Sequence, residues 1–130
     1  MTAFATRALP DACDVLAPDG SEVRVLLALA GGSIAQFLLP AGQVSRAVKH
    51  ATVEEIWYVL AGRGEMWRAQ QGRAEVVPVA AGTCLTIPLD TEFQFRAAAD
   101  APLAAVAITM PPWPGPEEAA FVEGAWAATV

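Results

Sequence analysis

Hydrophobic residues occur along the chain in runs of six to eight, and each run is cut by a glycine- or proline-containing turn. The runs are rich in β-branched and aromatic residues, and no window between 20 and 110 keeps a helical spacing without a Gly or Pro. This spacing predicts antiparallel strands of a sandwich or small barrel. The predicted strands are 23–30, 33–40, 54–61, 64–70, 74–80, 83–88, 92–97 and 103–110.

The two ends of the chain differ from this pattern. Residues 111–116 contain four prolines, which cannot pair as a central strand. We therefore expect an N-terminal extension over 1–20, a barrel over 21–110 and a Pro-rich tail over 111–130. Trp113 and Trp126 are expected to anchor this tail on the barrel.

Composition narrows the class of protein. The chain has 130 residues, of which 55% are hydrophobic and 17% are charged, and this composition predicts one folded domain. A net charge of −6 with scattered basic residues argues against a nucleic-acid partner. The sequence has no charged leader and no apolar run of membrane-spanning length, so we expect a cytoplasmic protein without a membrane partner. Cys13 and Cys84 lie in no disulfide or zinc spacing and are expected to be free.

One stretch carries candidate chemistry. Gly42 is followed after five residues by Val48, Lys49 and His50, then after four by Glu55 and after six by Gly62. A second stretch has Gly82, five residues, Pro88, Asp90 and then Phe93. Both spacings resemble the two motifs of the cupins, here small single-domain cupins, and the resemblance covers about residues 21–110.

This resemblance implies an all-β double-stranded β-helix, or jelly-roll barrel, with a ligand cavity in its mouth. It also implies a homodimer, which is common in the family, and in many members a metal held by three histidines and a glutamate. Only His50 and Glu55 match those four positions. Val48 and Phe93 stand where the other two histidines would be.

Two alternatives follow for the metal. A divalent transition metal, such as zinc, iron, manganese or nickel, needs a third ligand beside His50 and Glu55. Glu92 supplies it if the altered turn at Asp90 shifts the next strand by one residue, which reverses its faces. The favoured alternative has no metal, and His50 is hydrogen-bonded to Glu55.

A metal-free pair has chemistry of its own. A carboxylate raises the pKa of a nearby imidazole while burial lowers it, and the balance can bring the pKa near neutrality. His50 and Glu55 are thus candidate catalytic residues for acid–base chemistry. The alternative is a satisfied polar pair in the cavity wall.

Strand alternation assigns the remaining side chains to faces. With Glu55 inward, Trp57 and Val59 face inward, whereas the apolar row of Ile56, Tyr58 and Leu60 faces outward and needs a partner subunit or a covering segment. We expect an apolar and aromatic cavity for a small, fairly apolar organic molecule. Its predicted lining is Gln36, Trp57, Met66, Cys84, Phe93 and Phe95.

Function is less determined than fold, because one fold supports many reactions. The leading interpretation is an enzyme of the lyase, isomerase, cyclase or oxygenase kind. The alternative is a non-catalytic binding module or sensor that has lost its metal site. A structural interaction protein is the third interpretation.

Overall fold

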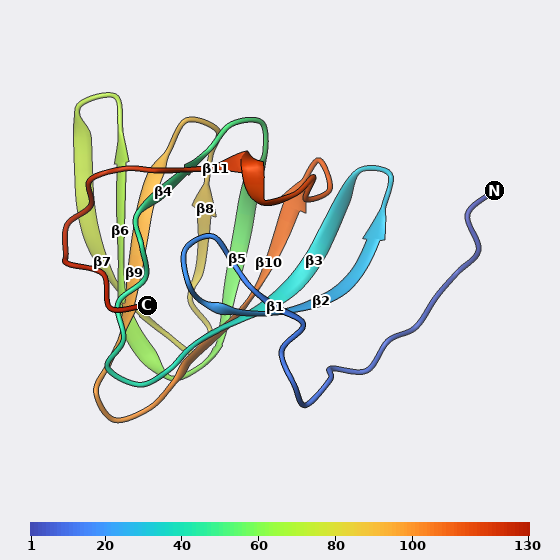
Figure 1. Ribbon diagram of the computed structural model, residues 1–130, viewed down its shortest axis with the longest axis horizontal. Helices are drawn as coiled ribbons and strands as arrows, with labels where there is room; N and C mark the ends of the chain where they lie inside the picture. Colours follow the sequence, from blue (N-terminus) through green and yellow to red (C-terminus); the bar gives the residue numbers. More distant parts are fainter.

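The computed structural model describes all 130 residues and consists of two antiparallel β-sheets that face each other (Figure 1). One sheet has the strand order β1-β2-β3-β10-β5-β8, and the other has the order β11-β4-β9-β6-β7. This all-β arrangement is a jelly-roll, as the sequence predicts. The strands are β1 (Val15–Leu16), β2 (Glu22–Leu29), β3 (Gly32–Leu39), β4 (Val48–His50), β5 (Glu54–Ala61), β6 (Arg63–Gln70), β7 (Arg73–Ala80), β8 (Cys84–Ile87), β9 (Glu92–Ala97), β10 (Leu103–Met110) and β11 (Ala119–Phe121).

All eight predicted strands are present, with ends shifted by two residues or fewer. The sequence did not predict β1, β4, β11 or the short 3-10 helix Pro116–Glu118. These elements have two or three residues each, which is too few for a periodic pattern to be visible. The structure contains no helix of membrane-spanning length and hydrophobicity.

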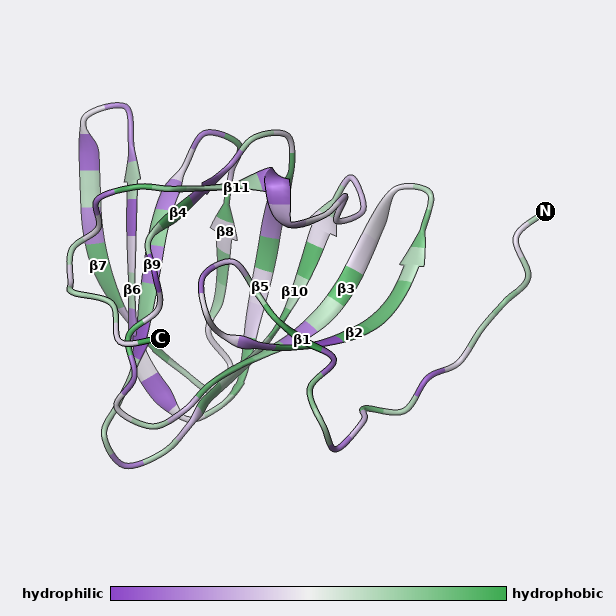
Figure 2. Ribbon diagram, viewed as in Figure 1, coloured by the Kyte–Doolittle hydropathy of each residue, from purple (hydrophilic) through white to green (hydrophobic).

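The space between the sheets is filled by one hydrophobic core. Inward residues alternate with outward ones along β5, where Glu55, Trp57 and Val59 are buried while Ile56 and Tyr58 are exposed. Figure 2 shows how hydrophobic residues (green) and hydrophilic residues (purple) are distributed over the strands of both sheets. Both predicted face assignments on this strand are confirmed. The buried core is formed by Leu39, Val48, Trp57, Val59, Met66, Val79, Leu85, Ile87, Phe93, Phe95, Ala97, Leu103, Ala105 and Ala107.

Two residues predicted to line the cavity face the opposite way. Phe37 stacks on Trp57 inside the barrel, with 5.4 Å between ring centroids, so its neighbour Gln36 lies on the outer face. There Gln36 accepts a hydrogen bond from Arg24 at 3.3 Å. Cys84 is exposed because the larger, apolar Leu85 takes the inward position on β8. The predictions for Gln36 and Cys84 are therefore wrong.

The outer face of the six-stranded sheet is apolar in its middle. Ile56, Tyr58 and Leu60 of β5 are 39 to 48% exposed, and Ile108 on the adjacent β10 is 43% exposed. Strand pairing places Ile108 directly beside Ile56. No segment of the chain covers these side chains.

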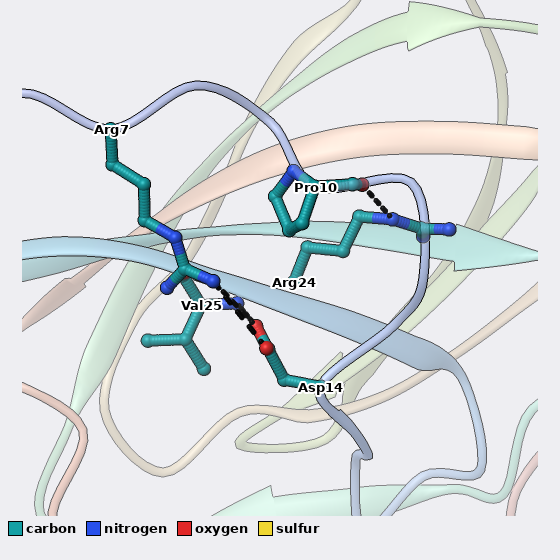
Figure 3. A network of polar contacts seen from close by, with 5 residues as sticks. All are labelled: Arg7, Pro10, Asp14, Arg24 and Val25. Carbon is teal, nitrogen blue, oxygen red and sulfur yellow. Dashed lines mark hydrogen bonds and ion pairs between the residues drawn. The ribbon is translucent and has the colours of Figure 1, made fainter.

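Residues 7–14 are bonded to β2, and the residues before them extend away from the body of the molecule (Figures 1 and 3). Arg24 donates to the carbonyl oxygens of Pro10 and Asp11 at 2.9 and 2.6 Å. The carboxylate of Asp14 accepts from the amide of Val25 at 2.8 Å and pairs with Arg7 at 3.4 Å. These contacts fix residues 7–14 along the edge of the sheet.

The C-terminal tail packs on the outer face of the five-stranded sheet. β11 pairs with β4, and beyond it Trp126 meets Gln94, which is 1% exposed. The Gln94 amide donates to Ser45 O and Trp126 O, both at 2.8 Å, and accepts from the Trp126 amide at 3.0 Å. Arg96 lies over the Trp126 indole, 4.1 Å from its centroid. Trp126 thus anchors the tail.

Removal of the Gln94 amide should loosen this anchor. Gln94→Ala leaves buried backbone groups without partners, so we expect a loss of about 2 to 3 kcal/mol in the free energy of unfolding. Chemical denaturation measures it. The control Gln70→Ala, at an exposed glutamine, should lose less than about 0.5 kcal/mol. Equal losses in the two variants would contradict this account of the tail.

Candidate functional site

His50 and Glu55 come from opposite sheets and meet at one end of the barrel. His50 is the last residue of β4, and Glu55 is the second residue of β5, so only the short loop 51–53 separates the strands. Both side chains point inward and are buried. His50 is 7% exposed and Glu55 is 4% exposed. The motif spacing therefore places an imidazole and a carboxyl group face to face.

A residue of the tail holds the loop between them. The buried carboxylate of Glu118 accepts hydrogen bonds from the Thr52 hydroxyl at 2.8 Å, from the Val53 amide at 2.7 Å and from the Thr52 amide. The Ala51 amide also donates to the Glu118 carbonyl oxygen at 2.9 Å. Burial works against the charge on Glu118, but these donors hold its pKa below the usual range. The loop that spaces His50 from Glu55 is thus fixed.

Glu55 has few donors and no charged partner to offset its burial. Thr109 Oγ1 donates to Oε2 at 3.0 Å, and Trp57 Nε1 approaches Oε1 at 3.4 Å. Burial raises the pKa of the Glu55 carboxyl to about 7, and these two donors reduce the shift only in part. Near neutral pH this carboxyl is therefore both a proton donor and a proton acceptor.

His50 faces Glu55 without a hydrogen bond. Its Nδ1 lies 3.7 Å from Glu55 Oε1 and has no hydrogen-bond partner, although it is buried. The rings of Phe93 and Trp113 meet the imidazole edge-on, at 5.2 and 5.1 Å between centroids. Burial lowers the pKa of His50 to about 4, so the ring is neutral at pH 7. The predicted hydrogen bond is absent, and the near-neutral pKa belongs to Glu55 instead.

Glu92 does not join the pair. Asp90 stands at the glycine position of the second motif and takes a left-handed backbone with φ 66°, which aspartate tolerates better than most residues. The following strand therefore keeps its register, and Phe93 pairs with Val48 and is buried. Glu92 pairs with Lys49 and alternates to the other face. The register shift that a third metal ligand required is not present.

The residues present do not fit a metal centre of three or more protein ligands. No group of three His, Cys, Asp or Glu side chains is placed to hold a metal ion. Val48 and Phe93 fill the motif positions beside His50 with side chains that cannot coordinate a metal. His50 and Glu55 are the two donors that the site provides.

Aromatic rings occupy the interior next to the pair. The Trp57 ring contacts those of Phe93 and Phe95, at 6.3 and 5.0 Å between centroids, and Met66 is buried beside Phe95. A pocket of about 620 Å³ is lined by the segment that joins β1 to β2 and by the tail, and neither His50 nor Glu55 lines it. The wall beside the pair is apolar, and Trp57, Met66, Phe93 and Phe95 are core residues at most 2% exposed. That these four side chains line a ligand cavity stays a prediction.

Three residues of the site were not predicted as parts of it. Thr109 is the polar inward residue of the apolar strand β10, and its alternation with Ala105 and Ala107 is a signal that could have revealed it. Glu118 and Trp113 reach the site from the tail, more than 60 positions beyond His50. No local pattern indicates such contacts.

Comparisons with known proteins agree on the fold. The family model for the cupin domain matches residues 35–109. A cupin protein from Bacteroides fragilis is 26% identical, with 85% of this chain and 86% of that chain covered and a TM-score of 0.65. A variant of PAC13 from Streptomyces, solved with uridine, is 16% identical over 95% and 93%, with a TM-score of 0.72. A predicted oxalate decarboxylase from Thermotoga maritima is 23% identical over 69% and 79%, with a TM-score of 0.59. Curated proteins give no match.

Burial of the pair predicts a specific dependence of stability on pH. Between about pH 4.5 and 7, folded Glu55 holds a proton that the unfolded chain has lost, so its contribution to stability falls as pH rises. His50 acts in the opposite sense between about pH 4 and 6.5, because only the unfolded chain then binds its proton. The two effects offset each other in the wild type.

The variant Glu55→Gln should separate the pH-dependent contribution of Glu55 to stability from that of His50. The free energy of unfolding of the variant, relative to that of wild type, should increase from pH 4.5 to 7 and then level off. The total increase should be a few kcal/mol, because one pKa unit corresponds to about 1.4 kcal/mol. Urea denaturation at several pH values measures this difference. Glu54→Gln, at the exposed neighbour, is the control and should show no such trend. A constant difference between Glu55→Gln and wild type would show that burial does not raise the pKa of Glu55.

Proposed function

This chain belongs to the cupin domain family, and from that premise we propose that it is an enzyme that transforms a small organic molecule at His50 and Glu55 by acid–base chemistry. The reaction is of the lyase or isomerase kind, in which a proton is moved and no electron leaves the substrate. Cyclase chemistry that needs only proton transfer also fits this pair. An oxygenase reaction is not supported, because the donor set does not fit the metal that such chemistry needs.

One observation carries the proposal. The carboxyl of Glu55 has a pKa of about 7 and lies 3.7 Å from an imidazole nitrogen that is buried without a partner. A general acid or base works best with a pKa near the working pH, because both protonation states are then available. A buried, unpartnered ring nitrogen is costly unless a ligand pairs with it.

The two side chains have different roles in this proposal. Glu55 takes a proton from a substrate carbon or oxygen, or returns one to a leaving group, as its pKa allows in either direction. Neutral His50 hydrogen-bonds a substrate oxygen or nitrogen through Nδ1 and so orients the molecule against Glu55. Thr109 fixes Oε2 of the carboxyl and leaves Oε1 to face His50.

The surroundings of the pair indicate the ligand class. Aromatic rings of Phe93 and Trp113 flank the imidazole, and no basic side chain pairs with Glu55. A neutral, planar molecule with a carbonyl or hydroxyl group suits this environment better than a phosphate, which requires basic partners. The uridine held by PAC13, a protein of similar fold, supports this size and shape as the first to test.

The second candidate function is a non-catalytic binding module or sensor. It is favoured by Val48 and Phe93, each 1% exposed, because they stand at the two motif positions where a metal-dependent cupin enzyme would have histidines. A ligand that only binds would raise the melting temperature and be recovered unchanged.

Catalysis can be tested before the substrate is identified. A panel of neutral planar carbonyl and hydroxyl compounds, beginning with uridine, is screened by the rise in melting temperature. Each hit is then incubated with metal-free protein in D₂O and analysed by mass spectrometry for deuterium incorporation or loss of water. We expect turnover that His50→Gln and Glu55→Gln each reduce by about 10²- to 10⁴-fold.

Glu92→Gln is the matched control and should retain turnover, because Glu92 faces away from the pair. Hits recovered unchanged with wild-type protein would favour the binding module. Turnover that persists in both His50→Gln and Glu55→Gln would remove the pair from the reaction.

A second copy of the chain is the proposed partner of the apolar outer face. The chain carries a net charge of −6, so two copies repel each other except where they meet through uncharged residues. Ile56, Tyr58, Leu60, Val106 and Ile108 form such a patch across β5 and β10. A symmetric dimer would pair this patch with itself.

Light scattering after size-exclusion chromatography tests the dimer. Wild type should have twice the chain mass of 13.6 kDa, and Tyr58→Glu should have the mass of one chain because it places charge in the interface. Leu89→Glu, at an apolar residue of similar exposure outside the patch, should remain dimeric. A monomeric wild type would remove the proposal.

A further inference from the structure

One side chain of the tail, that of Trp113, packs against the imidazole of the candidate site. Trp113 lies in the segment 111–115, between the end of β10 and the short helix Pro116–Glu118, and meets the His50 imidazole edge-on at 5.1 Å. Trp113 is 36% exposed, whereas His50 beneath it is 7% exposed. The indole therefore stands between solvent and the only histidine of the chain. Figure 1 shows the tail crossing the same end of the barrel as the loop between β4 and β5.

We propose that Trp113 is the gate of this site, so that a ligand reaches His50 only when the indole turns away. The inference rests on the proposed function only in taking His50 as the group to be reached. As a gate, Trp113 would select ligands in two ways: it controls access to His50, and it offers them an aromatic surface.

The backbone of the segment favours movement of the side chain alone. Pro111, Pro112 and Pro114 surround Trp113 and restrict the backbone of this segment. The Trp113 amide also donates to Ser33 Oγ of β3 at 3.0 Å. On the far side, Glu118 ties the tail to the loop 51–53 through three hydrogen bonds. With both ends held, rotation of the indole about its side-chain bonds opens the site at the least cost.

Phe93 is the second aromatic neighbour of His50. Phe93, on the other side of His50, is 1% exposed and belongs to the core. Displacement of Phe93 would require the core to be repacked, whereas displacement of Trp113 exposes a ring that already meets solvent. Of the two aromatic neighbours of His50, Trp113 is therefore the one that can be displaced at the lower cost.

The gate can be measured by chemical modification of His50. Diethyl pyrocarbonate transfers a carbethoxy group to a neutral imidazole nitrogen and releases ethanol and carbon dioxide. Mass spectrometry of the peptide that contains His50 gives the rate. Because a minor open state is populated at about 10% or less, removal of the cover should accelerate modification at least about tenfold. Trp113→Ala and the milder Trp113→Leu should both show this increase.

Trp126→Leu is the matched control, since Trp126 also anchors the tail but contacts Gln94 and Arg96 rather than His50. Its rate should stay within about twofold of wild type if local opening at Trp113 limits access. Near-UV circular dichroism must show that each variant is folded. A folded Trp113→Leu protein with an unchanged rate would overturn the gate, as would equal acceleration in Trp126→Leu.

The result of the modification experiment can be distinguished from the result of the turnover experiment that tests the proposed function. Faster modification in the Trp113 variants, combined with turnover that is insensitive to His50→Gln, would keep the gate and remove the catalytic role. An unchanged modification rate, combined with turnover that needs His50, would keep the enzyme and remove the gate.

Discussion

Burial of the Glu55 carboxyl, without a positive charge to pair with it, is the constraint on which the site depends. Removal from water disfavours the ionised form, and the donors from Thr109 and Trp57 compensate only in part. The neighbouring imidazole cannot supply the missing charge, because it is buried as well and stays neutral. Near pH 7 the Glu55 carboxyl is therefore partly protonated, whereas a solvated glutamate would be ionised.

The aromatic interior is the cause of this state. Phe93 and Val48 occupy two motif positions where many cupins have histidines, and both are almost completely buried. Their apolar side chains remove two metal ligands and two polar neighbours at once, so the desolvation of His50 and Glu55 is not relieved. The two side chains that leave too few ligands for a metal centre thus also keep the carboxyl in apolar surroundings, where burial raises its pKa toward the range in which acid–base catalysis is efficient.

The tail connects this site to the rest of the molecule. Glu118 fixes the loop that sets the distance between the pair, Trp113 covers the imidazole, and the Gln94–Trp126 contacts hold the end of the chain on the five-stranded sheet. All three contacts join residues that are far apart in the sequence. Through Trp113 the tail contributes to the burial of His50, and through Glu118 it fixes the spacing of the pair.

The sequence by itself determined the strands, their faces on β5 and the meeting of His50 with Glu55, because alternation and motif spacing are local properties of the chain. It did not determine which way Gln36 points, since either face of β3 offered apolar residues. On β8, Leu85 and Ile87 form a more apolar face than Cys84 and Thr86, so the outward position of Cys84 could have been predicted. The register at Asp90 depended on whether aspartate could adopt the glycine conformation, which excluded Glu92 from the site. The contacts of Thr109, Glu118 and Trp113 and the pKa values of the pair were decided by tertiary structure alone, because hydrogen-bond distances and desolvation depend on atoms brought together from distant segments.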